Sequence, residues 1–292
     1  MSTILITGAT GHFGKATIDF LLKKGLAASQ ISALARTAEK AADLKTKGIN
    51  VKIGDYTDYA SLTVAFKGVE KLFLISSSDL HNRVEQHTNA INAAKEAGVK
   101  HIIYTSFVRK NETATSPIAF LAQAHIETEN IIKASGIPYT ILLNSLYSDV
   151  LPGFLGEKVL ETGVFLPAGN GKAAFTARID MAEAAANILL STGHENKEYI
   201  IANTESNNLD ELAAFLEELS GKRVTYLNPS KESYIETATS AGLPKEYAGM
   251  FAAFSEAIEQ GEFENKNTDL ENLLGRKPTS LKAFLGTVYS RN

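Results

Sequence analysis

The chain of 292 residues contains no cysteine and no tryptophan. Without cysteine there can be no disulfide bond, no thiol nucleophile and no metal site built on thiolate ligands. Six histidines lie at positions 12, 81, 87, 101, 125 and 194, and no two of them are four residues apart. The paired histidines of a helical zinc site are therefore missing, and we expect no metal.

Neither sign of charge dominates the chain. Its 29 basic and 33 acidic side chains leave a formal net charge of −4, with an isoelectric point near 5.9. No stretch gathers the lysines and arginines that a nucleic-acid partner requires. No apolar run reaches the roughly 20 residues of a membrane span, and no signal-peptide pattern precedes the first strand. We expect a cytoplasmic protein with neither a nucleic-acid nor a membrane partner.

The catalytic pair of the ordinary short-chain dehydrogenases is also missing. In that pair, Tyr-x-x-x-Lys, the lysine lowers the pKa of the tyrosine so that the phenol can exchange a proton with the substrate. None of the ten tyrosines here has a lysine four positions later. Nucleophile-elbow, P-loop and EF-hand patterns are absent as well. The sequence therefore lacks the equipment for ordinary alcohol–carbonyl interconversion.

What the chain does have is a glycine-spaced turn at its start. An apolar run, Ile4-Leu5-Ile6, is followed by G-x-x-G-x-x-G and then by a helical pattern. Strand, glycine turn and helix in this order are typical of a site for a dinucleotide pyrophosphate, which binds at the helix N-terminus. The alternative is a tight turn with incidental glycines. The candidate cofactor-binding residues of this turn are Gly8, Ala9, Thr10, Gly11, His12, Phe13 and Gly14.

Two charged residues follow the next two predicted strands. Arg36 ends the strand 31–35, at the edge where the adenosine ribose is recognised in this architecture. An arginine there favours a 2′-phosphate and hence NADPH over NADH, because its planar fork binds phosphate oxygens. The alternative is a solvated surface arginine. Asp55 follows the third strand, where it could contact the adenine, cap a helix or form an Asx turn.

Hydroxyl side chains follow the fourth strand. Ser76, Ser77 and Ser78 come directly after the apolar run 71–75, and Thr105 lies near the end of the fifth strand. In open α/β sheets the carboxyl ends of the strands line the ligand crevice. Small hydroxyl residues there leave room for the ribose and nicotinamide. An ordinary polar loop is the alternative for the serines.

Strands and helices alternate six times up to residue 144, without a hairpin signal. This rhythm predicts an α/β fold, a doubly wound parallel sheet of the Rossmann type, with a smaller mixed C-terminal lobe. We expect residues 1–145 plus about 173–204 to form the NADP-binding domain. The glycine- and proline-rich stretch 146–172 and residues 205–292 are expected to form a substrate lobe.

Three residues are candidates for catalysis. His125 lies on a predicted helix beside Glu127 and Glu129, where it could donate a proton or simply pair with carboxylates on the surface. Asn144 ends the sixth strand and could orient the nicotinamide carboxamide or hold the following loop. Tyr147 could offer aromatic surface to a flat acceptor or belong to the core.

Taken together, these features resemble the NmrA-like atypical short-chain dehydrogenases, and among them most closely the quinone-reducing bacterial members. The resemblance includes the glycine turn, Arg36, the serine trio, His125-Ile126-Glu127-Thr128-Glu129 and Asn144-x-x-Tyr147-Ser148. It implies a Rossmann domain with a small lobe, NADPH or NADP as cofactor, and hydride transfer to quinones or similar conjugated acceptors. One departure is Leu143-Asn144-Ser145, where the family pattern has Arg-Asn-Gly.

The resemblance leaves two kinds of protein open. The first is an NAD(P)H:quinone oxidoreductase that prefers NADPH and has a small quinone-like molecule as partner, with a homodimer as a further expectation. A quinone suits a site without a strong general acid, because its reduced product is a stabilised phenolate and orientation does most of the work. The second is an NADP-binding redox sensor without turnover. A reductase using a helical lysine is disfavoured, because residues 118–132 contain none.

Overall fold

A computed structural model describes residues 3–290 of the chain. Its internal contacts divide the chain into two compact units. The first unit runs up to Phe107 and continues through Leu121–Asn144 and Ile179–Ile200; the second comprises Val108–Phe120, Ser145–Arg178 and the chain from Ile201 onward. The boundaries expected from the sequence differ mainly in Val108–Phe120, which the contacts group with the second unit.

The first unit is built on a seven-stranded sheet in the order β3-β2-β1-β4-β5-β6-β8. Pairing is parallel throughout the six strands from β3 to β6. This is the doubly wound Rossmann order, which confirms the predicted fold class. The strands are β1 (Ile4–Ile6), β2 (Ile31–Ala35), β3 (Asn50–Ile53), β4 (Lys71–Leu74), β5 (His101–Phe107), β6 (Tyr139–Asn144) and β8 (Lys197–Ile201).

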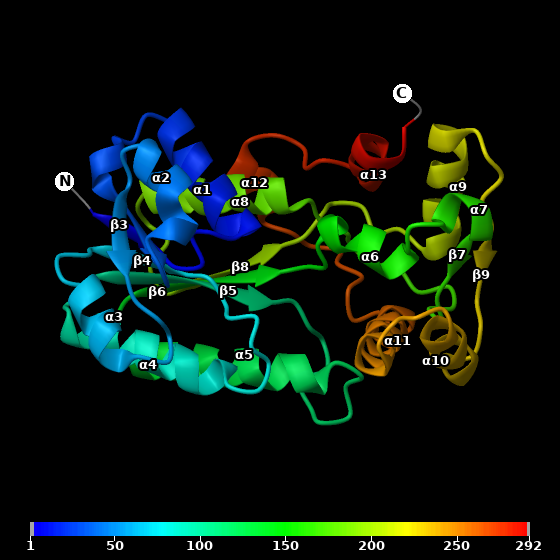
Figure 1. Cartoon of the computed structure of the whole chain (residues 1–292), viewed down its shortest axis with the longest axis horizontal. Helices are drawn as coiled ribbons and strands as arrows, with labels where there is room; N and C mark the ends of the chain where they lie inside the picture. The colour runs from blue at the N-terminus through cyan, green and yellow to red at the C-terminus, as the bar shows by residue number, and fades with distance from the viewer. Residues whose placement is uncertain (1–2, 291–292) are drawn as a thin grey trace. The chain divides into compact units, whose positions relative to one another are not determined.

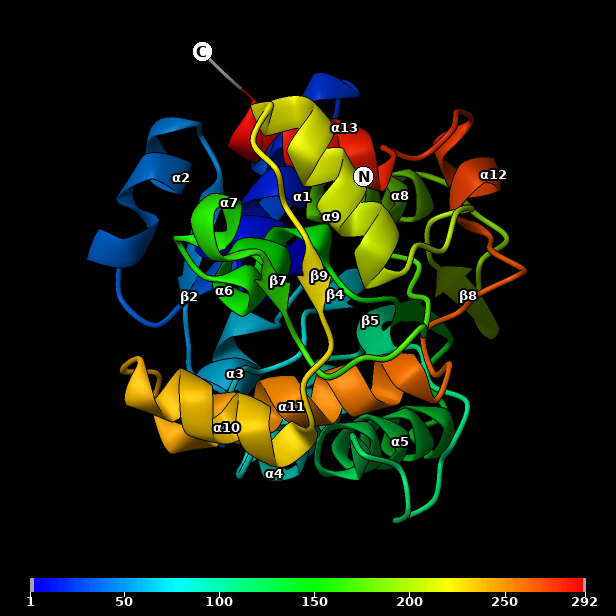
Figure 2. The ribbon, with the colours of Figure 1, turned by 90° about the vertical axis from the view of Figure 1, so that its right-hand side faces the viewer.

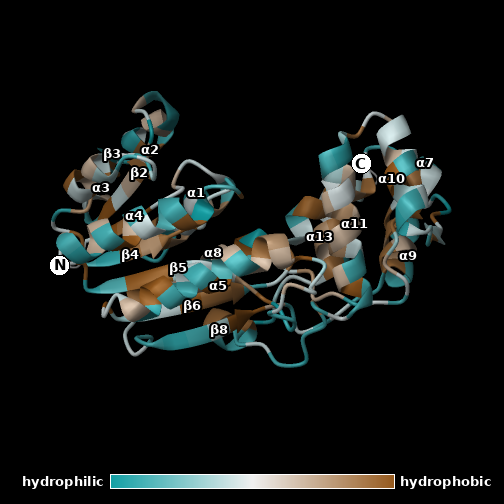
Figure 3. Ribbon diagram, turned by 90° about the horizontal axis from the view of Figure 1, so that it is seen from below, coloured by the Kyte–Doolittle hydropathy of each residue, from teal (hydrophilic) through white to brown (hydrophobic). Residues whose placement is uncertain are grey.

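Helices cover both faces of this sheet (Figures 1 and 3). One face carries α1 (His12–Lys23), α2 (Ala42–Thr46) and α8 (Arg178–Leu190); the other carries α3 (Tyr59–Ala65), α4 (Arg83–Glu96) and α5 (Ala119–Ala134). Residues 37–47, between β2 and β3, do not form one continuous helix. A 3₁₀ turn, η2 (Glu39–Ala41), precedes a short α2 there instead.

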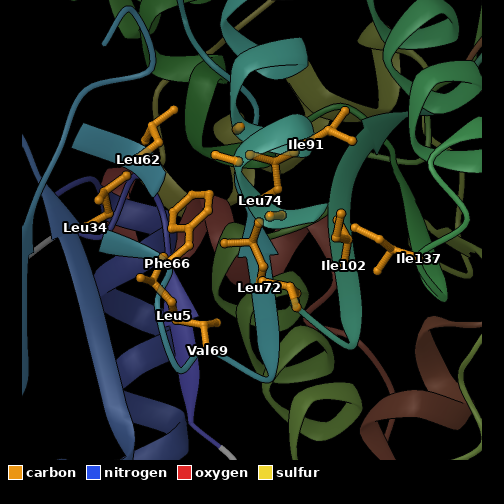
Figure 4. Close-up of a cluster of buried hydrophobic side chains, with 14 of the residues drawn as sticks. Leu5, Leu34, Leu62, Phe66, Val69, Leu72, Leu74, Ile91, Ile102 and Ile137 are labelled. Atoms are coloured by element: carbon orange, nitrogen blue, oxygen red, sulfur yellow. The ribbon is translucent and has the colours of Figure 1, made fainter. Parts of the chain in front are cut away.

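Because both faces are covered, the central strands are apolar along their whole length. A core cluster fills the space between the sheet, α3 and α4 (Figure 4). Leu72 and Leu74 of β4 meet Phe66 and Ile91 there, and none of the four is more than 1% exposed. The cluster fixes where β4 ends, and with it the position of the three serines that follow.

The second unit is mainly helical (Figure 2). Helix α9 begins with a capping box, in which Asn208 and Glu211 satisfy each other's backbone amides. The helices are α6 (Leu151–Leu155), α7 (Val159–Thr162), α9 (Leu209–Ser220), α10 (Lys231–Ser240), α11 (Lys245–Glu259), α12 (Leu270–Leu274) and α13 (Leu281–Tyr289). Two short strands, β7 (Val164–Phe165) and β9 (Tyr226–Leu227), pair in parallel. No helix within residues 3–290 is long and apolar enough to cross a membrane.

Candidate functional site

The glycine turn lies between β1 and α1, next to the point where the strand order reverses between β1 and β4. Gly8 has a φ of +57°, in the left-handed region that glycine adopts without strain. A Cβ on Gly14 would lie 2.5 Å from the Gly8 carbonyl oxygen and 2.7 Å from the Ala9 Cα. Helix α1 therefore packs directly on the turn. No side chain caps its first residues, as expected of a helix N-terminus that receives an anion.

A cavity of about 500 Å³ opens beside this turn in the first unit. It runs along the carboxyl ends of β2, β1 and β4, where open α/β sheets bind their ligands. Eight of the predicted cofactor residues line it, namely Gly8, Thr10, Gly11, Arg36, Asp55, Ser76, Ser77 and Ser78. Two features of this site fit a dinucleotide. Helix α1 packs so closely on the turn that a side chain at Gly14 would collide with it. Cationic and hydroxyl groups line opposite ends of the cavity.

The cationic end of the cavity holds Arg36 and a second cation that sequence reasoning missed, Lys40. Both follow β2, and the η2 turn brings them to one wall. Asp55 accepts hydrogen bonds from the backbone amide and hydroxyl of Thr57, at 2.9 and 2.8 Å, and these hold the pKa of its carboxyl below the usual range. It thus forms an Asx turn, one of the alternatives expected for it, while also lining the cavity.

At the other end, the segment Ser76–Ser78 is fixed by hydroxyl groups of neighbouring elements. The Ser76 amide donates to the Thr105 hydroxyl at 2.8 Å, and the Tyr56 hydroxyl donates to the Ile75 carbonyl at 2.8 Å. Thr105 is itself buried, so its hydroxyl holds the serine segment instead of lining the cavity.

One face of α4 binds Ser77 from behind. Arg83 donates from Nε to the Ser77 carbonyl at 2.8 Å, and the Ser77 amide donates to Nε2 of His87 at 2.9 Å. The Ser77 hydroxyl donates to Gln86, whose amide donates in turn to Asp79. The spacing i, i+3, i+4 places the three α4 residues on one helix face. Sequence reasoning missed them, although this spacing directly after the serine trio was a usable signal.

His87 is buried and neutral. Burial and the nearby charge of Arg83 lower its pKa to about 3. Its Nε2 accepts from the Ser77 amide, so its proton lies on Nδ1, which is 2.9 Å from the Thr128 hydroxyl. The tautomer follows from the fact that a backbone amide only donates.

His125 is 4% exposed, so the expectation of a surface histidine paired with carboxylates is wrong. Its Nε2 lies 3.2 Å from a guanidinium nitrogen of Arg83, and its Nδ1 lies 2.8 Å from the Tyr104 hydroxyl. The ring of Phe107 stacks on the imidazole at 6.0 Å between centroids. Burial raises the pKa of Tyr104. Both ring nitrogens of His125 are thus engaged within the first unit.

Asn144 and Tyr147 lie in different units. Asn144 ends β6 and is buried opposite Phe107 of β5. Tyr147 belongs to the second unit, where it forms a bridge with Thr176 and the Arg178 guanidinium lies 5.2 Å from its ring centroid.

The remaining predicted residues of the glycine turn support it and do not line the cavity. Ala9 and Phe13 are buried, and the Phe13 ring packs edge-on against Phe73 at 5.8 Å. His12 is exposed at the start of α1. The structure therefore brings Gly8, Gly11, Arg36, Asp55 and the serines to one cavity, whereas His125, Asn144 and Tyr147 do not line it.

A family model for the NmrA-like family matches residues 1–286 of this sequence. The chain belongs to the NmrA-like family. Among curated members, it is 43% identical over 292 residues to quinone oxidoreductase 2 of Escherichia coli, covering 99% of both chains. It is 29% identical over 253 residues to the NAD(P)H azoreductase of Xenophilus azovorans, covering 84% of this chain and 83% of that protein.

Solved structures of family relatives share the whole fold. The NADPH complex of an NADPH-dependent quinone oxidoreductase from E. coli matches with a TM-score of 0.91 at 41% identity, over 99% of this chain and all of that one. The NADP(H) complex of triphenylmethane reductase from Citrobacter sp. also matches with a TM-score of 0.91, at 39% identity, over 98% of this chain and 99% of that one. These likenesses bear out the resemblance read from the sequence.

Proposed function

We propose that this NmrA-like chain is an NADPH-dependent oxidoreductase that transfers hydride to quinones or similar conjugated acceptors. The observation that carries the proposal is the cavity of the first unit, with two cations at one end, the glycine turn beside it and the serine segment at the other end. Relatives similar over their full length are a quinone oxidoreductase and, in solved form, its NADPH complex.

In this proposal each part of the cavity binds a different part of the dinucleotide. Arg36 and Lys40 hold the 2′-phosphate, because two cations complement its double charge. The turn at Gly8 and the start of α1 hold the pyrophosphate. The segment Ser76–Ser78 receives the nicotinamide half. Bound NADPH supplies the hydride, and the protein supplies orientation and exclusion of water.

The proposed class of hydride acceptor follows from a catalytic pair that the sequence lacks. A carbonyl substrate needs a positioned acid to protonate its alkoxide, and no Tyr-x-x-x-Lys pair is present for that task. A quinone accepts hydride to give a phenolate that its ring stabilises, so water suffices as the proton source. Neither Asn144 nor Tyr147 lines the cavity of the first unit, so a role for them in orienting the bound groups stays a prediction from the sequence. The burial of His125 and its contacts with Arg83 and Tyr104 favour a positioning role for it.

We further propose that the first unit is the nucleotide-binding part and that the second unit supplies acceptor contacts. A homodimer, a cytoplasmic location and the lack of a nucleic-acid partner stay predictions. Size-exclusion chromatography with light scattering tests the first, and mobility-shift assays test the last.

Steady-state NADPH oxidation with a panel of small benzoquinones tests the proposed activity. We expect oxidation that depends on the quinone and saturates with its concentration, with NADH a poorer donor. The alternative of a redox sensor predicts tight binding of NADPH and NADP without oxidation by any quinone of the panel. A protein that binds neither nucleotide refutes both.

A further inference from the structure

The backbone around Ser77 is held from behind by two buried side chains of α4. Arg83 binds the Ser77 carbonyl, and His87 accepts from the Ser77 amide. Both side chains are at most 5% exposed, and neither lines the cavity. These two hydrogen bonds fix the orientation of the two peptide units that flank Ser77. They therefore also fix the directions of the Ser76 carbonyl and the Ser78 amide, which belong to those two units.

The consequence follows from the planar trans peptide, in which the carbonyl and the amide of one peptide unit point in opposite directions. No peptide within residues 3–290 is cis. Since the Ser77 amide points to His87, the carbonyl of Ser76 points away from His87. Since the Ser77 carbonyl points to Arg83, the amide of Ser78 points away from Arg83.

Ser76 and Ser78 both line the cavity. Within the part of the chain that the structure describes, no residue forms a hydrogen bond with the Ser76 carbonyl or the Ser78 amide. The segment therefore offers one backbone acceptor and one backbone donor at the cavity. Ser76 is half-buried and Ser78 is exposed. Without a protein partner, both backbone groups can bond to a ligand that fills the cavity.

The order of the strands in the sheet indicates which part of a dinucleotide would contact the Ser76 carbonyl and the Ser78 amide. Arg36 follows β2, whereas Ser76 follows β4, and β1 with its glycine turn lies between these strands. A dinucleotide with its 2′-phosphate at Arg36 and its pyrophosphate at the turn thus extends its nicotinamide half over β4. Both the ribose hydroxyls and the carboxamide of that half can donate and accept hydrogen bonds.

We propose that Arg83 and His87 are positioning residues for the nicotinamide half of the cofactor. They fix the Ser76 carbonyl and the Ser78 amide as its acceptor and donor. This inference rests on the proposed function. It assigns no proton transfer to either side chain, because both act through the Ser77 backbone.

The network behind α4 supports this role. Arg83 also contacts His125, and His87 contacts Thr128, so two residues of α5 fix the two positioning side chains in turn. Ser77 is further held by Gln86 through its hydroxyl. The amide, the hydroxyl and the carbonyl of Ser77 therefore each form a hydrogen bond with a side chain of α4.

The test compares two ligands by calorimetry: NADPH, and adenosine 2′,5′-bisphosphate, which has no nicotinamide half. Arg83→Met removes the donor at similar length, and His87→Leu removes the acceptor. We expect each to raise the Kd of NADPH about tenfold or more while changing that of the bisphosphate by less than about twofold. Arg83→Lys and His87→Gln, which retain a donor and an acceptor, should recover part of the loss.

His101→Gln is the matched control, because His101 is a buried histidine bonded to Thr140 and does not line the cavity. It should lower the melting temperature without changing the ratio of the two Kd values. Equal weakening of both ligands by the α4 variants, or no change, overturns the inference. If Arg83→Met does not fold, Arg83→Lys and His87→Gln still give the ratio. A wild-type chain that binds neither ligand overturns the proposed function as well.

Discussion

A guanidinium nitrogen of Arg83 lies 3.2 Å from Nε2 of His125, and both side chains are buried. Because a guanidinium only donates, Nε2 must accept, and the proton of the neutral imidazole lies on Nδ1, facing the Tyr104 hydroxyl 2.8 Å away. The contact joins α4, α5 and β5 behind the serine segment. It also leaves His125 without a ring nitrogen directed at the cavity.

For His125→Gln we therefore expect a loss of stability and little loss of chemistry. The change disturbs two buried hydrogen bonds, which should lower the free energy of unfolding by about 1–3 kcal/mol. Turnover with a benzoquinone should stay within about fivefold of wild type, because removal of a general acid typically costs about a hundredfold or more. Urea unfolding and steady-state kinetics measure the two effects. A loss of a hundredfold in kcat with unchanged stability would restore His125 as the proton donor.

Arg36→Ala should change the choice of cofactor. Loss of one phosphate-binding fork is expected to cost about 2 kcal/mol, or about thirtyfold in the Kd of NADPH. The Kd of NADH should barely change, because it has no 2′-phosphate. Lys40→Ala should act in the same direction, and Lys45→Ala serves as control because Lys45 does not line this cavity. Equal effects of Arg36→Ala on both nucleotides would contradict the assigned role.

Gly14→Ala should damage the nucleotide site. Its new Cβ would lie 2.5 Å from the Gly8 carbonyl oxygen, so the helix or the turn must move. We expect weaker NADPH binding and a lower melting temperature. Gly249→Ala is the matched control inside α11, where a Cβ meets nothing within 4 Å. That change should be neutral or stabilise by up to about 1 kcal/mol.

Stability should fall in acid partly through His87. Its pKa is lowered from 6.5 to about 3 in the folded chain. Between these pH values the unfolded chain binds a proton that the folded chain excludes, so stability is complete above about pH 6.5 and decreases as the pH falls toward 3. For this one group the decrease is at most about 1.4 kcal/mol per pH unit. His101 and His194, whose pKa values are also lowered, act in the same direction.

Urea unfolding at pH 7 and pH 5 checks this prediction. The difference in unfolding free energy between the two pH values should be smaller in His87→Gln than in wild type. An identical pH dependence in both proteins would show that His87 is protonated equally in the folded and unfolded chains.

Much of the first unit follows from local patterns. Glycine spacing located the turn at Gly8, and continuous apolar runs located the buried strands, since burial on both faces requires them. The alternation of strands and helices up to residue 144 likewise predicted the parallel sheet. These features depend on neighbours in the chain, so the sequence contains enough information to predict them.

The features that were missed depend on residues distant in the sequence. The burial of His125 results from packing α5 against Tyr104 and Arg83, and a helix pattern with glutamates on both sides indicates the opposite. Strand β7 has two residues and is stabilised only by pairing with β9. The role of α4 likewise requires knowing that its Arg83 and His87 meet the Ser77 backbone.

The central claim is that the first unit binds NADPH for hydride transfer to a quinone. The most direct test mixes the purified chain with NADPH and a small benzoquinone and follows loss of the reduced nicotinamide absorbance, against reactions lacking the chain or the quinone. We expect enzyme-dependent oxidation that saturates with both substrates and is slower with NADH. Oxidation no faster than in the reaction without the chain, across the quinone panel, would contradict the account.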